Sequence, residues 1–301
     1  MISIQEVAAF LGASIDAVSG DEQILHAKSI SDSSFGSGCI GWCSDANFNQ
    51  LTDLSGGTVL VSFRAVSQAD VIPNRLTLLQ VENPRRSFAE VLARFFMKKV
   101  PMGVIHPSAV IDMSVQYNPS TVHFGPNVVI EEGSEIGDNV LIGANSVIKQ
   151  GTRIRNNVQI GSNCTIGGVG FGYEKSESGD YLVVPHIGNV VLENNVEIGN
   201  NVCIDRAVMG STLLRENVKV DNLVHIAHGV EIGENSLIIA NAMIAGSVRI
   251  GKDAWVAPSS SIRQKITIGD NALIGLGSVV VKNVEADQIV AGVPAKPMTK
   301  K

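Results

Sequence analysis

The chain has 301 residues, of which 45% are hydrophobic and 17% charged, and its net charge is −6. This composition supports a packed core and excludes an intrinsically disordered chain. A negative net charge offers no general attraction for nucleic acid, so we expect no DNA or RNA partner. The start of the chain lacks an export signal, and no apolar stretch reaches the roughly 18 residues that cross a bilayer. The sequence therefore predicts a cytoplasmic protein without a membrane span.

The cysteines also limit the possible chemistry. Cys39, Cys43, Cys164 and Cys203 show neither a disulfide framework nor the paired spacing of a structural zinc site. We therefore expect reduced, mostly buried thiols and no bound metal.

The first hundred residues have no repeat and predict a small α+β domain. Ser3 is placed to cap a helix that Gly12 ends, and the segments TVLVSF and TLLQV have the composition of strands. A second helix is expected from Ser87 to Met97. The Pro and Gly residues between positions 98 and 107 indicate a linker, so the expected domains are residues 1–100 and 101–301.

Two aromatic residues of the first domain have two possible roles. Trp42 and Phe48 lie in the segment GWCSDANFNQ with polar residues between them. Two rings at this spacing can enclose a planar base, or both can fill the core of a small domain. Residue types alone favour the core.

From residue 130 onward, aliphatic residues recur every six positions. They are Ile130, Ile136, Ile142, Ile148, Ile154, Ile160 and Ile166, then Leu192, Ile198 and Ile204, then Leu214, Val220, Ile226, Ile232, Ile238, Ile244, Ile250, Val256, Ile262, Ile268, Ile274 and Val280. A period of six fits neither a helix nor simple strand alternation, so each hexad must be a short strand followed by a turn. Three hexads close one triangular coil, and stacked coils bury the aliphatic residues in columns. This pattern predicts a mainly β protein with a left-handed parallel β-helix of hexapeptide repeats.

The hexad pattern is interrupted twice. Residues 168–186 are rich in Gly and charge, and residues 205–212 form a shorter break. Inserted residues in a solenoid must leave the coil, so both segments are expected to be loops.

Several motifs along the chain resemble one family of enzymes. They are the opening helix, GWCSDANF, HPSAVID, GFGY, HIGNVVLENNVEIGNNVCIDR and DNLVHIAHGV. In this order they are similar to the UDP-3-O-acylglucosamine N-acyltransferases of lipid A biosynthesis, the LpxD family. The resemblance spans nearly the whole chain. It implies an N-acyltransferase that moves a 3-hydroxyacyl group from a thioester carrier to the amine of a UDP-linked glucosamine derivative.

The resemblance also assigns catalytic roles. His228 matches the family's catalytic base, Asp221 the supporting aspartate, and Gly246 the glycine of the oxyanion hole. Gly246 follows His228 by eighteen residues, which is one coil, so the two are expected to stack on one face. Histidine suits the role of base because its unperturbed pKa is about 6.5. By residue type alone, Asp221 can also be a turn-capping residue.

Substrate-binding roles follow from the same resemblance. Trp42 and Phe48 match aromatics that the family places against uracil, and Asp45 stands where the family usually has Asn. Lys265 replaces a second histidine that many relatives have, in a catalytic or phosphate-contacting position. His225 lies three residues before His228 and fits either substrate contact or packing at a subunit interface. His106, His123 and His186 are interpreted as surface or turn residues.

The C-terminal segment leaves the acyl donor open. The ending IVAGVPAKPMTKK resembles coenzyme A-dependent sugar acetyltransferases, whereas LpxD enzymes generally continue into helices that engage acyl carrier protein. The donor is therefore acyl carrier protein phosphopantetheine or coenzyme A, with no tightly bound cofactor. The resemblance further implies a homotrimer with active sites between neighbouring subunits.

Three alternatives remain open at this point. The first is an acyl-CoA-dependent N-acyltransferase that places a short acyl group on a UDP- or dTDP-linked amino-deoxysugar for surface polysaccharide. The second is a zinc carbonic anhydrase, which needs three histidines converging across subunits. The third is a structural or ice-binding rod, which would show a repeated Thr or uniformly polar face that the sequence lacks.

Overall fold

The computed structural model describes residues 2–16, 23–69 and 75–298. The chain forms two compact units, Met1–Lys99 and Val100–Lys301. None of the described helices has the length and apolarity that crossing a bilayer requires. Three of the cysteines, Cys39, Cys43 and Cys164, are buried and unpaired, whereas the thiol of Cys203 is exposed.

The first unit is built on a mixed five-stranded sheet in the order β2-β7-β6-β5-β4. Its strands are β2 (Ser14–Asp16), β4 (His26–Ala27), β5 (Cys39–Trp42), β6 (Thr58–Ser62) and β7 (Thr77–Val81), and β1 (Ile2–Ser3) pairs separately with β3 (Gln23–Ile24). Its helices are α1 (Ile4–Leu11), η1 (Asp45–Asp53), α2 (Phe63–Ser67), α3 (Pro84–Val91) and η2 (Leu92–Phe96). Strand β2 is antiparallel to β7, whereas the other neighbours run parallel.

The helix ends follow from the residues that cap them. The hydroxyl of Ser3 accepts a hydrogen bond from the N–H of Glu6, and Gly12 ends α1 in the left-handed conformation, as predicted. Helix α3 begins at Pro84, three residues earlier than predicted, because the Asn83 side chain caps it. Pro at the first helical position costs no hydrogen bond.

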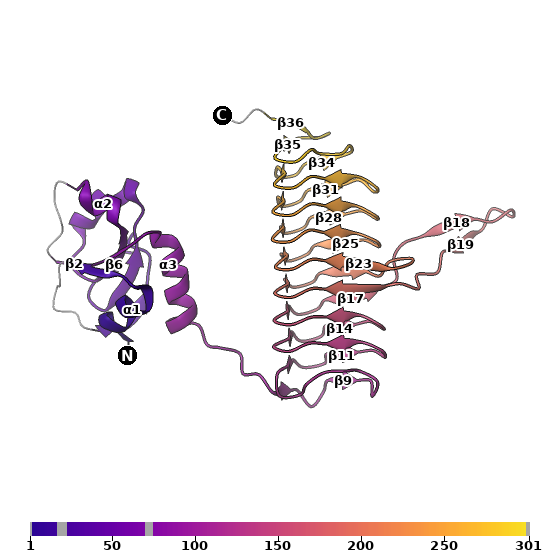
Figure 1. The fold of residues 1–301 in the computed structure, drawn as a ribbon, viewed down its shortest axis with the longest axis horizontal. Helices are drawn as coiled ribbons and strands as arrows, with labels where there is room; N and C mark the ends of the chain where they lie inside the picture. The colour runs from indigo at the N-terminus through magenta and orange to yellow at the C-terminus, as the bar shows by residue number, and fades with distance from the viewer. Residues whose placement is uncertain (1, 17–22, 70–74, 299–301) are drawn as a thin grey trace. The chain divides into compact units, whose positions relative to one another are not determined.

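The second unit is a parallel β-helix with three faces (Figure 1). One face contains β8 (Val104–Ile105), β10 (His123–Phe124), β13 (Leu141–Ile142), β16 (Gln159–Ile160), β21 (Glu197–Ile198), β24 (Lys219–Val220), β27 (Leu237–Ile238), β30 (Trp255–Val256), β33 (Leu273–Ile274), β35 (Ile289–Ala291) and β36 (Lys296–Pro297). We call this the first face.

The next strands along each coil form the second face. They are β9 (Val110–Ile111), β11 (Val129–Ile130), β14 (Val147–Ile148), β17 (Thr165–Gly168), β22 (Cys203–Asp205), β25 (His225–Ile226), β28 (Met243–Ile244), β31 (Ser261–Ile262) and β34 (Val279–Val280). The third face contains β12 (Glu135–Ile136), β15 (Arg153–Ile154), β20 (Asn189–Leu192), β23 (Ser211–Leu214), β26 (Glu231–Ile232), β29 (Arg249–Ile250) and β32 (Thr267–Ile268).

The hexad residues form the core of this unit. Every aliphatic residue of the six-residue pattern is at most 5% exposed. Equivalent residues stack in register, as where Ile226 pairs with Ile244 and Ile244 with Ile262. The predicted fold class is therefore confirmed. The driving force is the removal of a continuous aliphatic column from water.

The two corners that flank the second face differ. The corner between the first and second faces, here called the asparagine corner, carries Asn127, Asn145, Asn163, Asn201, Leu223, Asn241 and Ser259, all in the left-handed conformation. The corner between the second and third faces, here called the loop corner, contains both interruptions, residues 169–188 and 206–210. The longer loop forms the hairpin of β18 (Tyr173–Lys175) and β19 (Tyr181–Val183), which extends away from the stacked coils (Figure 1).

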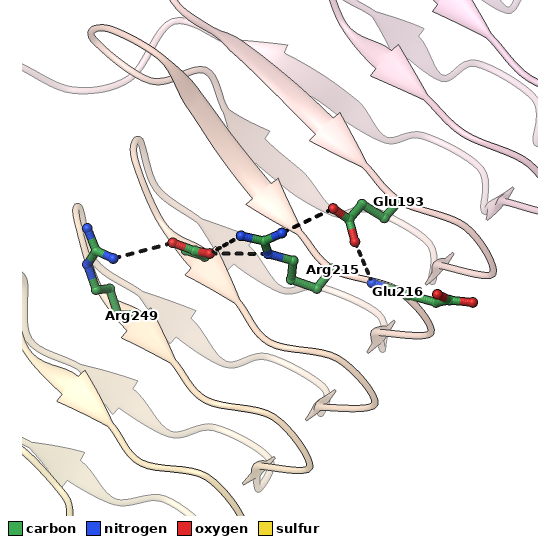
Figure 2. A network of polar contacts seen from close by, with 5 residues as sticks. Glu193, Arg215, Glu216 and Arg249 are labelled. Atoms are coloured by element: carbon green, nitrogen blue, oxygen red, sulfur yellow. Dashed lines mark hydrogen bonds and ion pairs between the residues drawn. The ribbon is translucent and has the colours of Figure 1, made fainter.

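On the third face, charged side chains connect successive coils (Figure 2). The guanidinium of Arg215 lies 3.4 Å from the carboxylate of Glu193 and 2.7 Å from that of Glu231, which also faces Arg249 at 3.5 Å. Such partly exposed pairs each contribute about 1 kcal/mol or less. They join neighbouring coils on the face away from the asparagine corner.

Candidate active site

His228 and Gly246 meet at the loop corner. They follow β25 and β28, which pair in register on consecutive coils. A Cβ atom built on Gly246 would lie 2.7 Å from Nε2 and 2.8 Å from Cε1 of His228. The imidazole therefore lies directly over the α-carbon of Gly246, in space that any larger residue would fill. The structure brings these two residues together within a single chain.

The backbone of Gly246 presents a free donor next to this ring. Its carbonyl accepts the N–H of Lys265 at 3.0 Å, and the following N–H, of Ser247, donates to the carbonyl of His228 at 2.9 Å. No described residue accepts the N–H of Gly246 itself. An unused backbone N–H beside a partly buried imidazole is the arrangement that stabilises a developing oxyanion.

The electrostatic environment of His228 favours the neutral imidazole. Burial, and then the charge that His186 would carry, lower the pKa of His228 below its ordinary value of 6.5. At pH 7 the ring is therefore able to accept a proton.

His186 lies beside His228, contrary to its interpretation as a surface or turn residue. Its side chain is buried, and the two ring centroids are 5.2 Å apart with the planes at 78°. No spacing rule relates a residue of an aperiodic loop to the coil that it packs against. The glycine-rich composition of residues 167–172 is the sequence signal that this loop approaches something closely.

Asp205 and His225 extend this cluster along the second face. Oδ2 of Asp205 lies 3.6 Å from Nε2 of His225, and the Asp205 side chain is only 14% exposed. Burial raises the pKa of the Asp205 carboxyl, although His225 and His186 act in the opposite direction. His225 thus pairs with a carboxylate of its own chain. Among the described residues, no three His, Cys, Asp or Glu side chains converge as metal ligands.

Arg206 anchors the longer loop where it leaves the coil. Its Nε donates to the carbonyl of Gly167 at 2.8 Å, its Nη2 to that of Gln150 at 3.0 Å, and its backbone N–H to that of Gly168 at 2.8 Å. Hydrogen bonds from a charged donor are among the stronger ones. The shorter interruption therefore fixes the root of the longer one.

Asp221 lies at the asparagine corner, at the opposite end of β25 from His228. Its carboxylate accepts hydrogen bonds from the N–H of Asn222 at 2.7 Å and of Ala240 at 3.2 Å. Within one chain, Asp221 is thus a turn-capping residue and is not brought to His228.

The residues expected to bind the nucleotide are in the first unit, and the two rings do not form a sandwich. Phe48 is 6% exposed and belongs to one core cluster, whereas Trp42 is partly buried against another. Asp45 is exposed, and its carboxylate accepts a hydrogen bond from the hydroxyl of Ser62 at 2.6 Å.

Lys265 lies at the loop corner, one coil beyond Gly246. Its side chain is exposed, and its backbone has a φ of 59°. The site therefore has a lysine side chain in solvent next to the coil that carries Gly246.

This chain is similar to known protein families in sequence and to solved structures in fold. The family signature described as bacterial transferase hexapeptide (six repeats) matches residues 120–150, 136–169 and 211–246, and the hexapeptide repeat of succinyl-transferase matches residues 265–285. LpxA from Acinetobacter baumannii superposes with a TM-score of 0.57 at 26% identity, covering 65% of this chain and 73% of that one. Fold and repeats together define a hexapeptide-repeat acyltransferase.

Curated relatives narrow this class. A UDP-3-O-acylglucosamine N-acyltransferase from Coxiella burnetii is 35% identical over 263 residues, which cover 81% of this chain and 74% of the relative. One from Helicobacter pylori is 42% identical over 65% of this chain and 61% of its own length. One from Legionella pneumophila is 47% identical over 54% of this chain and 51% of its own. The chain belongs to the UDP-3-O-acylglucosamine N-acyltransferase family, and it is an N-acyltransferase.

Proposed function

We propose that this chain transfers a 3-hydroxyacyl group from a thioester carrier to the amine of a UDP-3-O-acylglucosamine, a step of lipid A biosynthesis. Family membership supports the substrate class. The observation that carries the chemistry is the imidazole of His228 lying over Gly246, beside a backbone N–H that no described residue accepts.

The first requirement of this reaction is a neutral amine, because an ammonium group has no lone pair. The lowered pKa of His228 leaves its imidazole unprotonated at pH 7. It accepts the proton that the amine loses as the new C–N bond forms. General base catalysis of this kind typically contributes a factor of about 10² to 10⁴.

The second requirement is stabilisation of the tetrahedral intermediate, whose carbonyl oxygen becomes negatively charged. The N–H of Gly246 is the donor that we assign to this oxygen. When the intermediate collapses, the C–S bond breaks and the proton held by His228 moves to the departing thiolate. The products are an amide and a free thiol, so no other reactant is needed.

We assign the support of His228 to Asp221 of a neighbouring copy. Within one chain these residues occupy different corners of the β-helix. A homotrimer in which the asparagine corner of one copy faces the loop corner of the next would bring them together. A carboxylate there would orient the imidazole and stabilise its protonated form.

We assign the uridine to the first unit, with Trp42 as the stacking residue. Its ring is only partly buried, whereas Phe48 lies within the other core cluster, so Phe48 has a structural role in this domain. Asp45 is exposed and therefore accessible to a ligand. Trp42→Ala is expected to raise the KM for the UDP-sugar with kcat little changed. An unchanged KM would return Trp42 to a purely structural role.

We assign binding of the diphosphate of the UDP-sugar to the exposed side chain of Lys265. We place His225, whose imidazole lies next to the carboxyl group of Asp205, beside the substrate. Lys265→Ala should then raise the KM for the UDP-sugar more at low than at high ionic strength, because salt screens exposed charges. A salt-independent KM would remove Lys265 from phosphate binding.

The decisive experiment compares acyl donors. Purified protein is offered UDP-3-O-acylglucosamine with either 3-hydroxyacyl-acyl carrier protein or the matching acyl-CoA, and products are identified by mass spectrometry. We expect an N-acylated product with the carrier-protein donor. Transfer only from a short-chain acyl-CoA to a UDP- or dTDP-linked amino-deoxysugar would contradict this proposal. It would support the alternative, an acyl-CoA-dependent N-acyltransferase of surface polysaccharide synthesis. His228→Ala protein is the control for uncatalysed transfer.

A further inference from the structure

His186 is a buried histidine with one unused nitrogen. The residue is 7% exposed, and Nδ1 lies 2.8 Å from the carbonyl oxygen of Val184. Because a carbonyl can only accept, Nδ1 carries the proton of the neutral ring, and Nε2 is left as an acceptor. In the described part of the chain Nε2 has no hydrogen-bond partner. A buried unsatisfied polar atom is costly and calls for an explanation.

Two glycines of the longer loop enclose this ring. A Cβ atom on Gly170 would lie 2.8 Å from Nε2 of His186 and 3.0 Å from Cβ of His228, and one on Gly172 would lie 3.1 Å from Cε1 of His186. Residues 170–172, at the start of the loop, can therefore pack against His186, at its end, only because Gly170 and Gly172 have no side chains. Gly170 thus lies against both His186 and His228.

The contacts on His228 come from two sides. His186 meets it edge to face at 5.2 Å, and Gly246 lies against Nε2 and Cε1. Among the titratable groups, His186 from the loop contacts it, whereas Asp205 from β22 and His225 from β25 lie next to each other on the second face. The charges that His225 and His186 would carry lower the pKa of Asp205 against the effect of burial, and protonated His186 would oppose protonation of His228.

We propose that His186 is a positioning residue: its ring, which Gly170 covers, holds the His228 imidazole over Gly246. This inference rests on the proposed function, in which His228 is the base. The contact with His228 is made by the ring, and Nε2 has no hydrogen-bond partner among the described residues. A misplacement of about 1 Å at a reacting group can cost about 10²-fold in rate.

Two variants separate the ring from its hydrogen bond. His186→Phe keeps a ring against His228 and loses the donor to Val184, whereas His186→Asn keeps an N–H donor and loses the ring. Positioning predicts that kcat falls about tenfold or more in His186→Asn, that His186→Phe retains most of it, and that the KM for the UDP-sugar is unchanged in both. If His186 only anchors the loop, His186→Asn retains more activity than His186→Phe, and the proposal is overturned.

A second readout is independent of turnover. The imidazole signals of His228 are followed by NMR as a function of pH in the full-length protein. Removal of His186 should move the titration midpoint of His228 upward in both variants, because the opposing charge is lost. The ring signals of His228 should broaden in His186→Asn and stay sharp in His186→Phe, which keeps a ring in contact. Unchanged signals in both variants would overturn the proposal even if activity fell. An active His228→Ala protein would instead remove the proposed function, while the NMR result would stand.

If substitution of His186 unfolds the protein, the contact between His186 and His228 can be tested by a substitution at Gly170 instead. Gly170→Ala should displace the two imidazoles and lower kcat, because its Cβ would overlap both rings. Gly168→Ala is the matched control, since its Cβ meets Thr165 and Asp205 only at 3.5 and 3.6 Å. Equal activity of the two variants would contradict the proposal.

Discussion

The two corners that flank the second face of the β-helix share the same left-handed turn but differ in the side chains that they carry. At the asparagine corner, side-chain amides of successive coils bond to one another, as from Asn127 to Asn145 at 3.1 Å and from Asn145 to Asn163 at 3.2 Å. At the loop corner, the equivalent left-handed positions hold Gly229, Ser247 and Lys265 and form no such ladder. His228 and Gly246 stand one position earlier on their coils, and two insertions leave the β-helix at this corner.

The difference shows where a repeat protein can place chemistry. Identical residues on successive coils satisfy one another, which stabilises the stack but leaves no group free for a ligand. Where the repeat is broken, neighbouring coils present different residues, and an imidazole meets a glycine. The following predictions test whether the groups that react lie at the loop corner and whether the asparagine corner contributes to the stability of the stack.

The largest effect is expected at His228. His228→Ala should lower kcat by about 10² to 10⁴, because the amine loses the base that accepts its proton. Steady-state kinetics check this, and light scattering of the same sample verifies that assembly is unchanged. A correctly assembled variant with ordinary turnover would show that the loop corner does not hold the base.

A smaller loss of activity is expected from a single methyl group. In Gly246→Ala, the new Cβ would lie within 2.7 Å of the imidazole, so the ring must move. We expect kcat to fall by about 10²-fold, the usual cost of misplacing a reacting group by about 1 Å. Gly168→Ala, at the same corner but in ordinary contact, should keep its activity and serves as the control.

The pH dependence tests the environment of the corner. Since burial and His186 lower the pKa of His228, the acid limb of kcat/KM should have its midpoint below pH 6.5. The folded protein also binds this proton more weakly than the unfolded chain does. The stability that His228 contributes is therefore complete above pH 6.5 and is lost as the pH falls through the folded-state pKa. A midpoint above 6.5 would contradict the assigned environment.

The smallest effect is expected at the asparagine corner, where Leu223 occupies a left-handed position with φ of 62° and is 59% exposed. The left-handed conformation costs residues other than Gly, Asn and Asp roughly 1 to 2 kcal/mol. Leu223→Asn should therefore raise the free energy of unfolding by about 1 kcal/mol, measured by denaturant titration. The reverse change at the next coil, Asn241→Leu, should lower it. A destabilised Leu223→Asn would indicate that the leucine makes contacts that outweigh its strain.

Much of the first unit could be predicted from local signals. The hydroxyl of Ser3 and the left-handed Gly12 set the ends of the first helix, because both act on backbone groups only a few residues away. The start of α3 was missed because Asn83 and Pro84 give an equally local signal, which the apolar pattern conceals. The separation of Trp42 and Phe48 into two core clusters depends on how the helices cover the sheet, which residue spacing does not reveal.

The sequence alone determined the β-helix, its aliphatic columns and the stacking of His228 on Gly246, because a period of six closes the coil every eighteen residues wherever the chain continues it. Tertiary structure decided what the loops do. His186 reaches His228 through an aperiodic segment, and Arg206 holds the root of that segment. Such contacts depend on how a chain without a repeat folds back on itself, and only packing in three dimensions selects that path.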